Sequence, residues 1–283
     1  MLTVTAYAKI NLTLEVLGRR EDGYHDIISV MQTIGLCDTI SLVESDRITL
    51  RSNLSSLETT SNLILRAADI LKEHTGYSGG VEIYLHKSIP MSSGLGGGSS
   101  DAAATLKALV QLWQLSLPKE ELSRLADAIG SDVTYFIIGN TAIVEGRGEQ
   151  VQELPPLHTE HLVVVAPTVD IQDKTANMYA NLGIEEHTDG ETSVSLRRCI
   201  EERRRPNSKL LFNAFEAVAF RMFPPLDNYR EQMLNAGASW VHLAGSGPAM
   251  YTFAPSRRKA MVIASKLRRA GYRAYATSTI GSR

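Results

Sequence analysis

A glycine-rich loop leading into a helix constrains this chain more than any other stretch. Residues 90–104 read Pro-Met-Ser-Ser-Gly-Leu-Gly-Gly-Gly-Ser-Ser-Asp-Ala-Ala-Ala. Upstream, residues 81–86 alternate apolar and polar side chains, which is typical of a strand with one buried face. The four glycines of residues 94–98 let the backbone adopt positive φ and approach a ligand closely. The stretch therefore predicts a strand, a ligand-binding loop and a helix in succession.

The helix after the loop makes a phosphate group the expected ligand. Ser99, Ser100 and Asp101 are all good N-cap residues, and apolar side chains recur at helical spacing from Ala102 to Trp113. A helix N-terminus presents unpaired N–H donors and the positive end of the macrodipole. The alternative is a tight turn between strand and helix with no ligand, but such a turn does not require so many glycines.

Two well-known phosphate loops do not fit this stretch. A Walker A loop needs Gly-Lys-Ser or Gly-Lys-Thr at its end, and no lysine follows the glycines before Lys107. The dinucleotide fingerprint Gly-x-Gly-x-x-Gly/Ala places Ser99 or Asp101 at its last position. A different kind of phosphate loop is therefore expected.

Composition limits the remaining classes of function. A chain of 283 residues allows two modest domains, and a net charge of −2 does not favour nucleic acid or a membrane surface as a partner. Cys37 and Cys199 lack the spacing of a zinc site or of a disulfide framework. Without a signal peptide or a membrane-spanning run, we expect a soluble cytoplasmic protein that is a monomer or a weak homodimer.

The loop resembles the phosphate loop of the GHMP kinases, and its triple glycine is similar to the branch of 4-diphosphocytidyl-2-C-methyl-D-erythritol kinases. Further segments are similar to motifs of that family in the expected order. These segments are Ala8-Lys-Ile-Asn-Leu12, Arg20-Glu-Asp-Gly-Tyr-His25, Ser131-Asp-Val-Thr-Tyr-Phe136, Lys174-Thr-Ala-Asn-Met-Tyr179 and Ala244-Gly-Ser-Gly-Pro248.

The resemblance implies an α+β protein with the two-domain GHMP kinase fold. Residues 1–153 would form an N-terminal α/β domain that carries the phosphate loop and binds ATP. Residues 154–283 would form a C-terminal ferredoxin-like domain, and the polar stretch around Pro155-Pro156 favours a junction there. Three further elements are predicted from pattern: a hairpin of residues 39–43 and 47–51, a helix capped by Asn62 and ended by Gly76, and a helix over residues 210–222.

The resemblance also implies a reaction, the ATP-dependent phosphorylation of the 2-hydroxyl of 4-diphosphocytidyl-2-C-methyl-D-erythritol in the non-mevalonate route to isoprenoid precursors. Asp132 would accept the hydroxyl proton, and Lys9 would steady Asp132 and offset developing charge. Pattern alone favours simpler roles, an edge charge facing solvent or a cleft for Lys9 and an N-cap for Asp132. Thr134 replaces a proline of the family pattern, which puts the local geometry in doubt.

The loop is expected to bind both the nucleotide and the metal ion. The residues expected to bind the triphosphate of ATP are Pro90, Met91, Ser92, Ser93, Gly94, Leu95, Gly96, Gly97, Gly98, Ser99 and Ser100. The chemistry implies Mg²⁺, and Ser100 is the candidate for a direct metal contact. Asp101, a carboxylate beside phosphates, is expected to cap the helix.

The acceptor would be held by residues from three segments. Asn11 would help to fix it, Tyr24 and Tyr179 would sandwich the cytosine ring, and His25 would hydrogen-bond to the base edge. Thr175 lies one helical turn before Tyr179 and would approach the catalytic pair. Without the resemblance, Tyr24 and His25 read more simply as a boundary aromatic residue beside a surface histidine.

Three alternatives remain open at this point. A GHMP kinase with homoserine, mevalonate or a sugar as acceptor would have no use for a pair of base-stacking aromatic residues. An NAD-binding oxidoreductase would need a parallel βαβ unit, yet a second helix is expected after the first. A nucleotide-binding module without activity would bind ATP and not turn it over.

Overall fold

The computed structural model describes residues 1–168 and 174–281. Its strands form a seven-stranded sheet and a four-stranded sheet, so the predicted mixture of helices and sheets is confirmed. The chain divides into two compact units, each assembled from separate stretches of sequence. Unit 1 comprises Met1–Ala8, Leu36–Met91 and Gly96–Gly139, and unit 2 comprises Lys9–Gly35, Ser92–Leu95 and Asn140–Arg283. A single domain junction near residue 153 stays a prediction.

Eleven strands are formed by the described residues. They are β1 (Leu2–Arg19), β2 (His25–Ser45), β3 (Thr49–Ser52), β4 (Gly80–His86), β5 (Thr141–Gly146), β6 (Gln150–Glu153), β7 (His161–Val165), β8 (Phe212–Asn213), β9 (His242–Leu243), β10 (Met250–Ala254) and β11 (Ala274–Ser278). The long strands β1 and β2 contribute residues to both units.

The same residues form nine α-helices and three short 3₁₀ helices. The α-helices are α1 (Leu63–Thr75), α2 (Gly97–Leu112), α3 (Lys119–Ile129), α4 (Ser131–Ile138), α5 (Lys174–Ala180), α6 (Glu191–Glu201), α7 (Phe215–Met222), α8 (Pro225–Ala236) and α9 (Arg257–Arg269). The 3₁₀ helices are η1 (Ser55–Leu57), η2 (Ile184–Glu186) and η3 (Ser208–Leu210).

The strands of unit 1 correct one prediction. Residues 39–51 do not form a hairpin, because β4 lies between β2 and β3 in the sheet. Glu82 of β4 is in register with Val43 of β2 on one side and with Thr49 of β3 on the other. The chain crosses the end of β4, where the Val81 N–H donates to the Arg47 carbonyl at 3.1 Å. This crossover makes β3 parallel to β4 and leaves β2 antiparallel to it.

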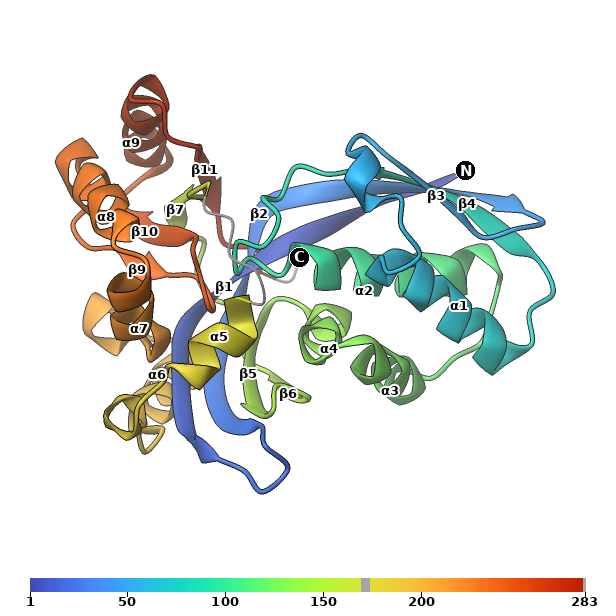
Figure 1. Ribbon diagram of the computed structural model, residues 1–283, viewed down its shortest axis with the longest axis horizontal. Coiled ribbons are helices and arrows are strands. Elements are labelled where there is room, and N and C mark those ends of the chain that lie inside the picture. Colours follow the sequence, from blue (N-terminus) through green and yellow to red (C-terminus); the bar gives the residue numbers. More distant parts are fainter. Residues whose placement is uncertain (169–173, 282–283) are drawn as a thin grey trace. The chain divides into compact units, whose positions relative to one another are not determined.

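Four helices cover one face of the strands of unit 1 (Figure 1). Helix α1 begins and ends as predicted: the Asn62 side chain accepts a hydrogen bond from the Ile64 N–H, and Gly76 adopts a left-handed conformation. Helix α2 begins earlier than predicted, because Gly96 with φ of 71° serves as its N-cap. Ser99, Ser100 and Asp101 therefore lie within the helix and not at its cap.

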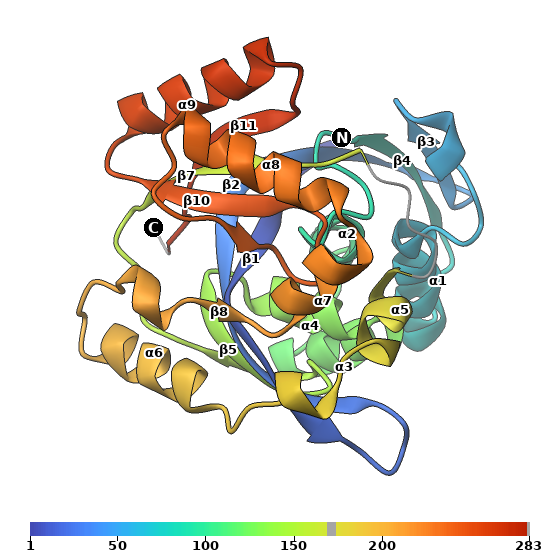
Figure 2. The same cartoon turned by 60° about the vertical axis from the view of Figure 1, so that its left-hand side comes forward.

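In unit 2 the four-stranded sheet has the order β11-β7-β10-β9, and its neighbouring strands are antiparallel. Helices α8 and α9 cover one face of this sheet (Figures 1 and 2). This order, with β7 and β10 in the centre, is that of a ferredoxin-like sheet, as predicted. The core between sheet and helices includes Val163, Val165, Met250, Ile263 and Leu267.

The helix predicted over residues 210–222 is interrupted. Asn213 belongs to β8, which pairs in parallel with Thr13 and Leu14 of β1, and α7 begins only at Phe215. The Asn213 side chain explains the break, because its amide N–H₂ donates to Leu243 O and Gly245 O, and its Oδ1 accepts from the Phe215 N–H. Hydrogen bonds from one polar side chain to residues distant in sequence therefore override the helical pattern.

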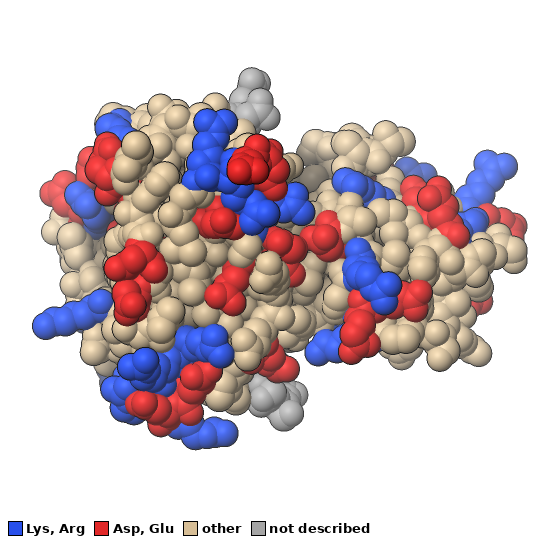
Figure 3. All heavy atoms as spheres, turned by 90° about the horizontal axis from the view of Figure 1, so that it is seen from below, with Lys and Arg blue, Asp and Glu red and all other residues tan. Residues whose placement is uncertain are grey.

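The surface agrees with the near-neutral net charge. On the face drawn in Figure 3, basic and acidic side chains are interspersed. Among the helices of residues 1–168 and 174–281, none combines the length and the hydropathy that crossing a bilayer would require.

Candidate active site

The predicted phosphate loop, residues 90–100, is divided between the two units. Pro90, Met91 and residues 96–100 belong to unit 1, whereas Ser92–Leu95 belongs to unit 2. In unit 1 the loop continues into the first turn of α2, where the Ser100 hydroxyl donates to the Tyr7 carbonyl of β1 at 2.6 Å. Ser100 is 3% exposed. This bond anchors the start of α2 to the first strand within unit 1.

A buried group of three charged side chains supports this part of the loop. Lys87 precedes the loop, and its Nζ lies 2.5 Å from Asp38 Oδ2 and 2.6 Å from Asp101 Oδ2. The predicted capping role of Asp101 is therefore wrong, since its carboxylate pairs with Lys87 and Gly96 caps α2. The other oxygen of Asp38 accepts from the Ser88 and Ile89 N–H groups. The cluster ties the residues before the loop to the helix after it.

The environment of Asp101 disfavours its ionised form. Burial raises the pKa of the Asp101 carboxyl from 3.8 to about 8, the Asp38 charge adds to this rise, and Lys87 opposes it. One cation shared by two buried acids cannot fully compensate both. The Oδ1 atom of Asp101 is buried without a hydrogen-bond partner among the described residues. A protonated Asp101 therefore fits the cluster at neutral pH.

In unit 2 the loop residues Ser92–Leu95 pack against the turn of residues 244–249. The Ala249 N–H donates to Ser93 O, and the Lys9 N–H donates to Leu95 O, both at 3.0 Å. Gly94 has φ of +85°, and a Cβ at this position would lie 2.0 Å from the Ala244 carbonyl oxygen. Only glycine allows so close an approach, so packing alone already requires glycine at position 94.

Lys9 and Asn11 are almost completely buried, which corrects the expectation that they lie at a solvated edge of the strand. They are 4% and 2% exposed, because residues 8–16 of β1 are covered on both faces. Lys9 Nζ donates to Asn11 Oδ1 at 2.7 Å, and Asn11 Nδ2 donates to Ser29 Oγ at 2.8 Å. Ser29 in turn donates to the Thr13 carbonyl. This chain of hydrogen bonds fixes the position of the Lys9 ammonium within unit 2.

Asp132 lies in the first turn of α4, where Gly130 is the N-cap, so the simpler N-cap interpretation is wrong. A carboxylate in this position interacts favourably with the helix macrodipole. The Lys107 side chain of α2 donates to the Phe136 carbonyl and fixes α4 against α2. Asp132 belongs to unit 1 and Lys9 to unit 2, and their catalytic pairing stays a prediction.

The predicted acceptor residues of unit 2 are partly assembled. The His25 ring stacks on the Tyr179 ring with centroids 4.8 Å apart and an interplanar angle of 21°. Tyr24 is 58% exposed, with the Arg147 guanidinium 5.0 Å from its ring centroid. The structure thus pairs Tyr179 with His25, and a sandwich of the base between Tyr24 and Tyr179 stays a prediction.

The electrostatics and the neighbours of these residues are compatible with base recognition. Burial, His187 and Arg19 lower the pKa of His25, so the neutral imidazole is favoured and can donate through one nitrogen and accept through the other. Thr175 Oγ1 lies 3.2 Å from Ser246 Oγ in the turn of residues 244–249.

Sequence reasoning missed several residues that hold these parts together. Besides the Lys87 cluster they include Lys174, which contacts Ser92, and Asn213, which contacts the carbonyls of residues 243 and 245. Tyr251 donates its buried hydroxyl to the Asn11 carbonyl. Nothing in the sequence distinguishes these side chains from surface lysines or core tyrosines, because their partners are distant in sequence.

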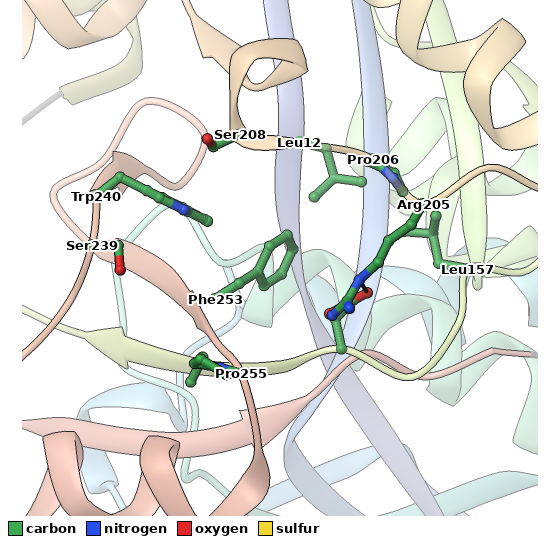
Figure 4. Close-up of a pocket in the computed structure, with 11 residues that line it drawn as sticks. Leu12, Leu157, Arg205, Pro206, Ser208, Ser239, Trp240, Phe253 and Pro255 are labelled. Atoms are coloured by element: carbon green, nitrogen blue, oxygen red, sulfur yellow. Dashed lines mark hydrogen bonds and ion pairs between the residues drawn. The ribbon is translucent and has the colours of Figure 1, made fainter.

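A separate recess of about 260 Å³ lies in unit 2 and involves none of the predicted site residues. Phe253 lies between Trp240 and Arg205, whose guanidinium forms two hydrogen bonds with Glu160 (Figure 4). The Glu160 and Arg205 charges therefore satisfy each other, and we assign the recess no role.

Mg²⁺ is expected to bind mainly through substrate phosphates and water, with few protein ligands. Within residues 1–168 and 174–281 no three His, Cys, Asp or Glu side chains cluster as a ready metal site. Ser100 fits such a role, since its hydroxyl donates to Tyr7 and its oxygen can still accept or coordinate. Asp101 is tied to Lys87 and is a poorer candidate.

Comparison with known proteins defines the class. The family model of the GHMP kinases N terminal domain matches residues 62–140, and that of the GHMP kinases C terminal domain matches residues 195–273. Phosphomevalonate kinase from Streptococcus pneumoniae shares the fold, with a TM-score of 0.70, 15% identity and coverage of 99% of this chain and 100% of that one. The chain therefore has the fold of the GHMP kinases and belongs to that superfamily.

More similar proteins identify the branch. A 4-diphosphocytidyl-2-C-methyl-D-erythritol kinase of Dehalococcoides mccartyi is 43% identical, with 99% of each chain covered. One from Chlorobaculum tepidum is 40% identical over 94% of this chain and 93% of its own. A crystal structure of 4-(cytidine 5'-diphospho)-2C-methyl-D-erythritol kinase superposes with a TM-score of 0.84 at 33% identity, covering 99% of this chain and 100% of that one. This chain belongs to the family of 4-diphosphocytidyl-2-C-methyl-D-erythritol kinases.

Proposed function

We propose that this protein transfers the γ-phosphoryl group of ATP to the 2-hydroxyl of 4-diphosphocytidyl-2-C-methyl-D-erythritol, a step of the non-mevalonate pathway of isoprenoid biosynthesis. The observation that carries the proposal is full-length identity of 43% to a kinase of that name. This identity extends over 99% of both chains, so it covers every segment to which we assign a role. The loop that precedes α2 supplies the phosphate-binding element that such a reaction needs.

In this mechanism Asp132 orients the acceptor hydroxyl and takes its proton as the oxygen attacks the γ-phosphorus, while the bond from the γ-phosphorus to the β–γ bridging oxygen breaks and ADP leaves. Phosphoryl transfer depends mainly on positioning and on stabilisation of charge, so a fixed cation beside the transferring group is valuable. Lys9 provides it, and its hydrogen bond to Asn11 supports this role because a side chain held in place needs no reorganisation. Asn11 also helps to position the acceptor.

The loop of residues 90–100 binds the triphosphate through backbone N–H groups. Support comes from the glycine conformations, with φ of +85° at Gly94 and +71° at Gly96, and from the N-terminus of α2 directly after them. Mg²⁺, with Ser100 as its candidate protein ligand, neutralises phosphate charge when it is bound.

His25, Tyr24 and Tyr179 recognise the cytosine, and Thr175, one helical turn before Tyr179 on α5, approaches the catalytic pair. The support is the stacked His25 and Tyr179 rings, which present aromatic surface of the kind that binds a nucleobase. This feature separates the proposed acceptor from homoserine or mevalonate, neither of which carries an aromatic base.

Turnover of ATP with the purified protein and the diphosphocytidyl substrate tests the proposal. Asp132→Asn should lower kcat about 10²- to 10⁴-fold, the usual contribution of a general base. Asp127→Asn is the matched control, because Asp127 is exposed on α3 in the same unit, and it should leave kcat unchanged. Equal activity of the two variants would refute the base assignment, and turnover of homoserine or mevalonate in place of the diphosphocytidyl substrate would refute the acceptor.

A further inference from the structure

Lys174 occupies an unusual position in unit 2. It is the first residue of α5 and is only 9% exposed. Its Nζ donates to the Ser92 carbonyl at 2.9 Å and also to the Gly247 carbonyl. Its ammonium therefore lies where the loop residues Ser92–Leu95 meet the turn of residues 244–249.

The charge of Lys174 is not balanced by the described part of the protein. No carboxylate of residues 1–168 or 174–281 pairs with it, and the charged group that acts on it is Lys9, which has the same sign. Residues 92–95 and 244–249 carry no ionisable side chain. Burial and the Lys9 charge lower the pKa of Lys174 from 10.5 to about 8. A buried cation is costly unless a counter-charge reaches it.

The Lys174 ammonium and the neighbouring turn of residues 244–249 also have hydrogen-bond donors without acceptors among the described residues. An ammonium group has three N–H donors, and two of those of Lys174 have acceptors among the described residues. Gly245 is buried with φ of +57°, yet its N–H and that of Ser246 have no backbone acceptor among those residues. Buried N–H groups are nearly always paired in a complete complex. Consecutive free N–H groups in a turn are typical of a small anion-binding concavity.

We propose that Lys174 is a phosphate-binding residue, whose ammonium contacts a phosphate oxygen of a bound substrate together with the N–H groups of Gly245 and Ser246. The substrate phosphate supplies the counter-charge that the described protein lacks. This inference rests on the proposed function for the choice of anions, which are the triphosphate of ATP and the diphosphate of the acceptor. Both present the same chemistry to Lys174, and separate ligands distinguish them.

Calorimetric binding to the intact protein tests the proposal with two pairs of ligands. CDP is compared with cytidine, and a non-hydrolysable ATP analogue is compared with adenosine, so each pair differs in its phosphates. Lys174→Met removes the ammonium and keeps an unbranched side chain. Lys209→Met is the matched control, because Lys209 is an exposed lysine of the same unit. A titration with wild-type protein gives the reference affinities.

The expected result is a selective loss. Lys174→Met should weaken CDP or the ATP analogue about tenfold or more, the effect of losing a charge-assisted hydrogen bond, and leave cytidine and adenosine within about twofold. The weakened nucleotide identifies which phosphate is bound. Equal weakening of nucleosides and nucleotides would mean that Lys174 only clamps the loop to the turn, and that result, like unchanged affinity for all four ligands, overturns the proposal.

The proposed function and this inference fail in different ways. Wild-type protein that binds the ATP analogue but not CDP refutes the acceptor, while the analogue and adenosine still decide the role of Lys174. Wild-type protein that binds neither nucleotide refutes both.

A measurement on wild-type protein decides the matter if Lys174→Met does not fold. Above a pH of about 8 the ammonium loses its proton, so affinity for a phosphate-bearing ligand should fall between pH 7 and 9.5. Phosphate groups, whose second pKa is about 6, change little in charge over this range. Lys9 faces the same place, so Lys174→Arg separates the two lysines: an arginine stays charged and should abolish the fall. A flat wild-type profile, or an unchanged fall in Lys174→Arg, overturns the proposal.

Discussion

Lys87 Nζ lies 2.6 Å from Asp101 Oδ2, so a charge-assisted hydrogen bond joins the residue that precedes the predicted phosphate loop to the helix that follows it. Both side chains are almost completely buried, and Asp38 of β2 shares the same ammonium. Gly97 lies so close to this group that a Cβ there would be 2.8 Å from Lys87 Nζ. The start of α2 is thus held in unit 1 by charge as well as by apolar packing.

Removing the shared cation should be strongly destabilising. Lys87→Met leaves the Asp38 carboxylate buried without a counter-charge, and we expect a loss of about 3–5 kcal/mol in the free energy of unfolding. Denaturant titration at pH 7 measures it. Lys119→Met is the control, since Lys119 is exposed on α3, and should change stability by less than about 0.5 kcal/mol. Similar values for the two variants would contradict the assigned role of Lys87.

The raised pKa of Asp101 predicts a pH-dependent difference from Asp101→Asn. The folded protein binds this proton more tightly than the unfolded chain does. The stabilisation that the proton gives to the folded state is therefore fully present below pH 3.8 and is lost as pH rises through about 8. The stability of Asp101→Asn relative to wild type should therefore increase between pH 5 and 8.5, by at least about 1 kcal/mol. Urea titrations at several pH values measure this difference. A difference that does not change with pH would show that Asp101 is ionised throughout.

The close approach at Gly94 predicts a costly substitution. Gly94→Ala must place a methyl group against the Ala244 carbonyl as well as strain a residue with φ of +85°. We expect it to displace Ser92–Leu95 from the turn and to weaken ATP binding about tenfold or more. Gly271→Ala is a matched control, because Gly271 has φ of +87° and open space around its Cα. Equal ATP affinity of the two variants would exclude the packing explanation.

Stacking on Tyr179 predicts a selective change in the acceptor KM. Stacking of a base on an aromatic ring contributes about 1–3 kcal/mol, so Tyr179→Ala should raise the KM for the diphosphocytidyl substrate about tenfold, with little change in the KM for ATP. Tyr179→Phe keeps the ring that stacks on His25 and should behave nearly as wild type. Steady-state kinetics with each substrate varied in turn measures both KM values. Equal loss of activity in the two variants would contradict a stacking role for Tyr179.

Much of the local structure follows from the sequence because its causes are local. Asn62 and Gly76 bound α1 as predicted, since a capping side chain and a left-handed glycine act within a few residues. The order β11-β7-β10-β9 also agrees with the ferredoxin-like pattern of helices and strands. Predictions failed where a distant partner decided the outcome: β4 separates the two strands of the expected hairpin, and Asn213 interrupts the expected helix.

The amino-acid sequence by itself determined the glycine-rich loop, the helix behind it and the family, because glycine spacing and motif order depend only on the order of residues along the chain. Only the tertiary structure decided that Asp101 pairs with Lys87, that Lys9 is buried, and that Lys174 meets Ser92 and Gly247. The reason is physical: a charged side chain acquires its role from the groups that replace water around it, and folding brings those groups from distant segments.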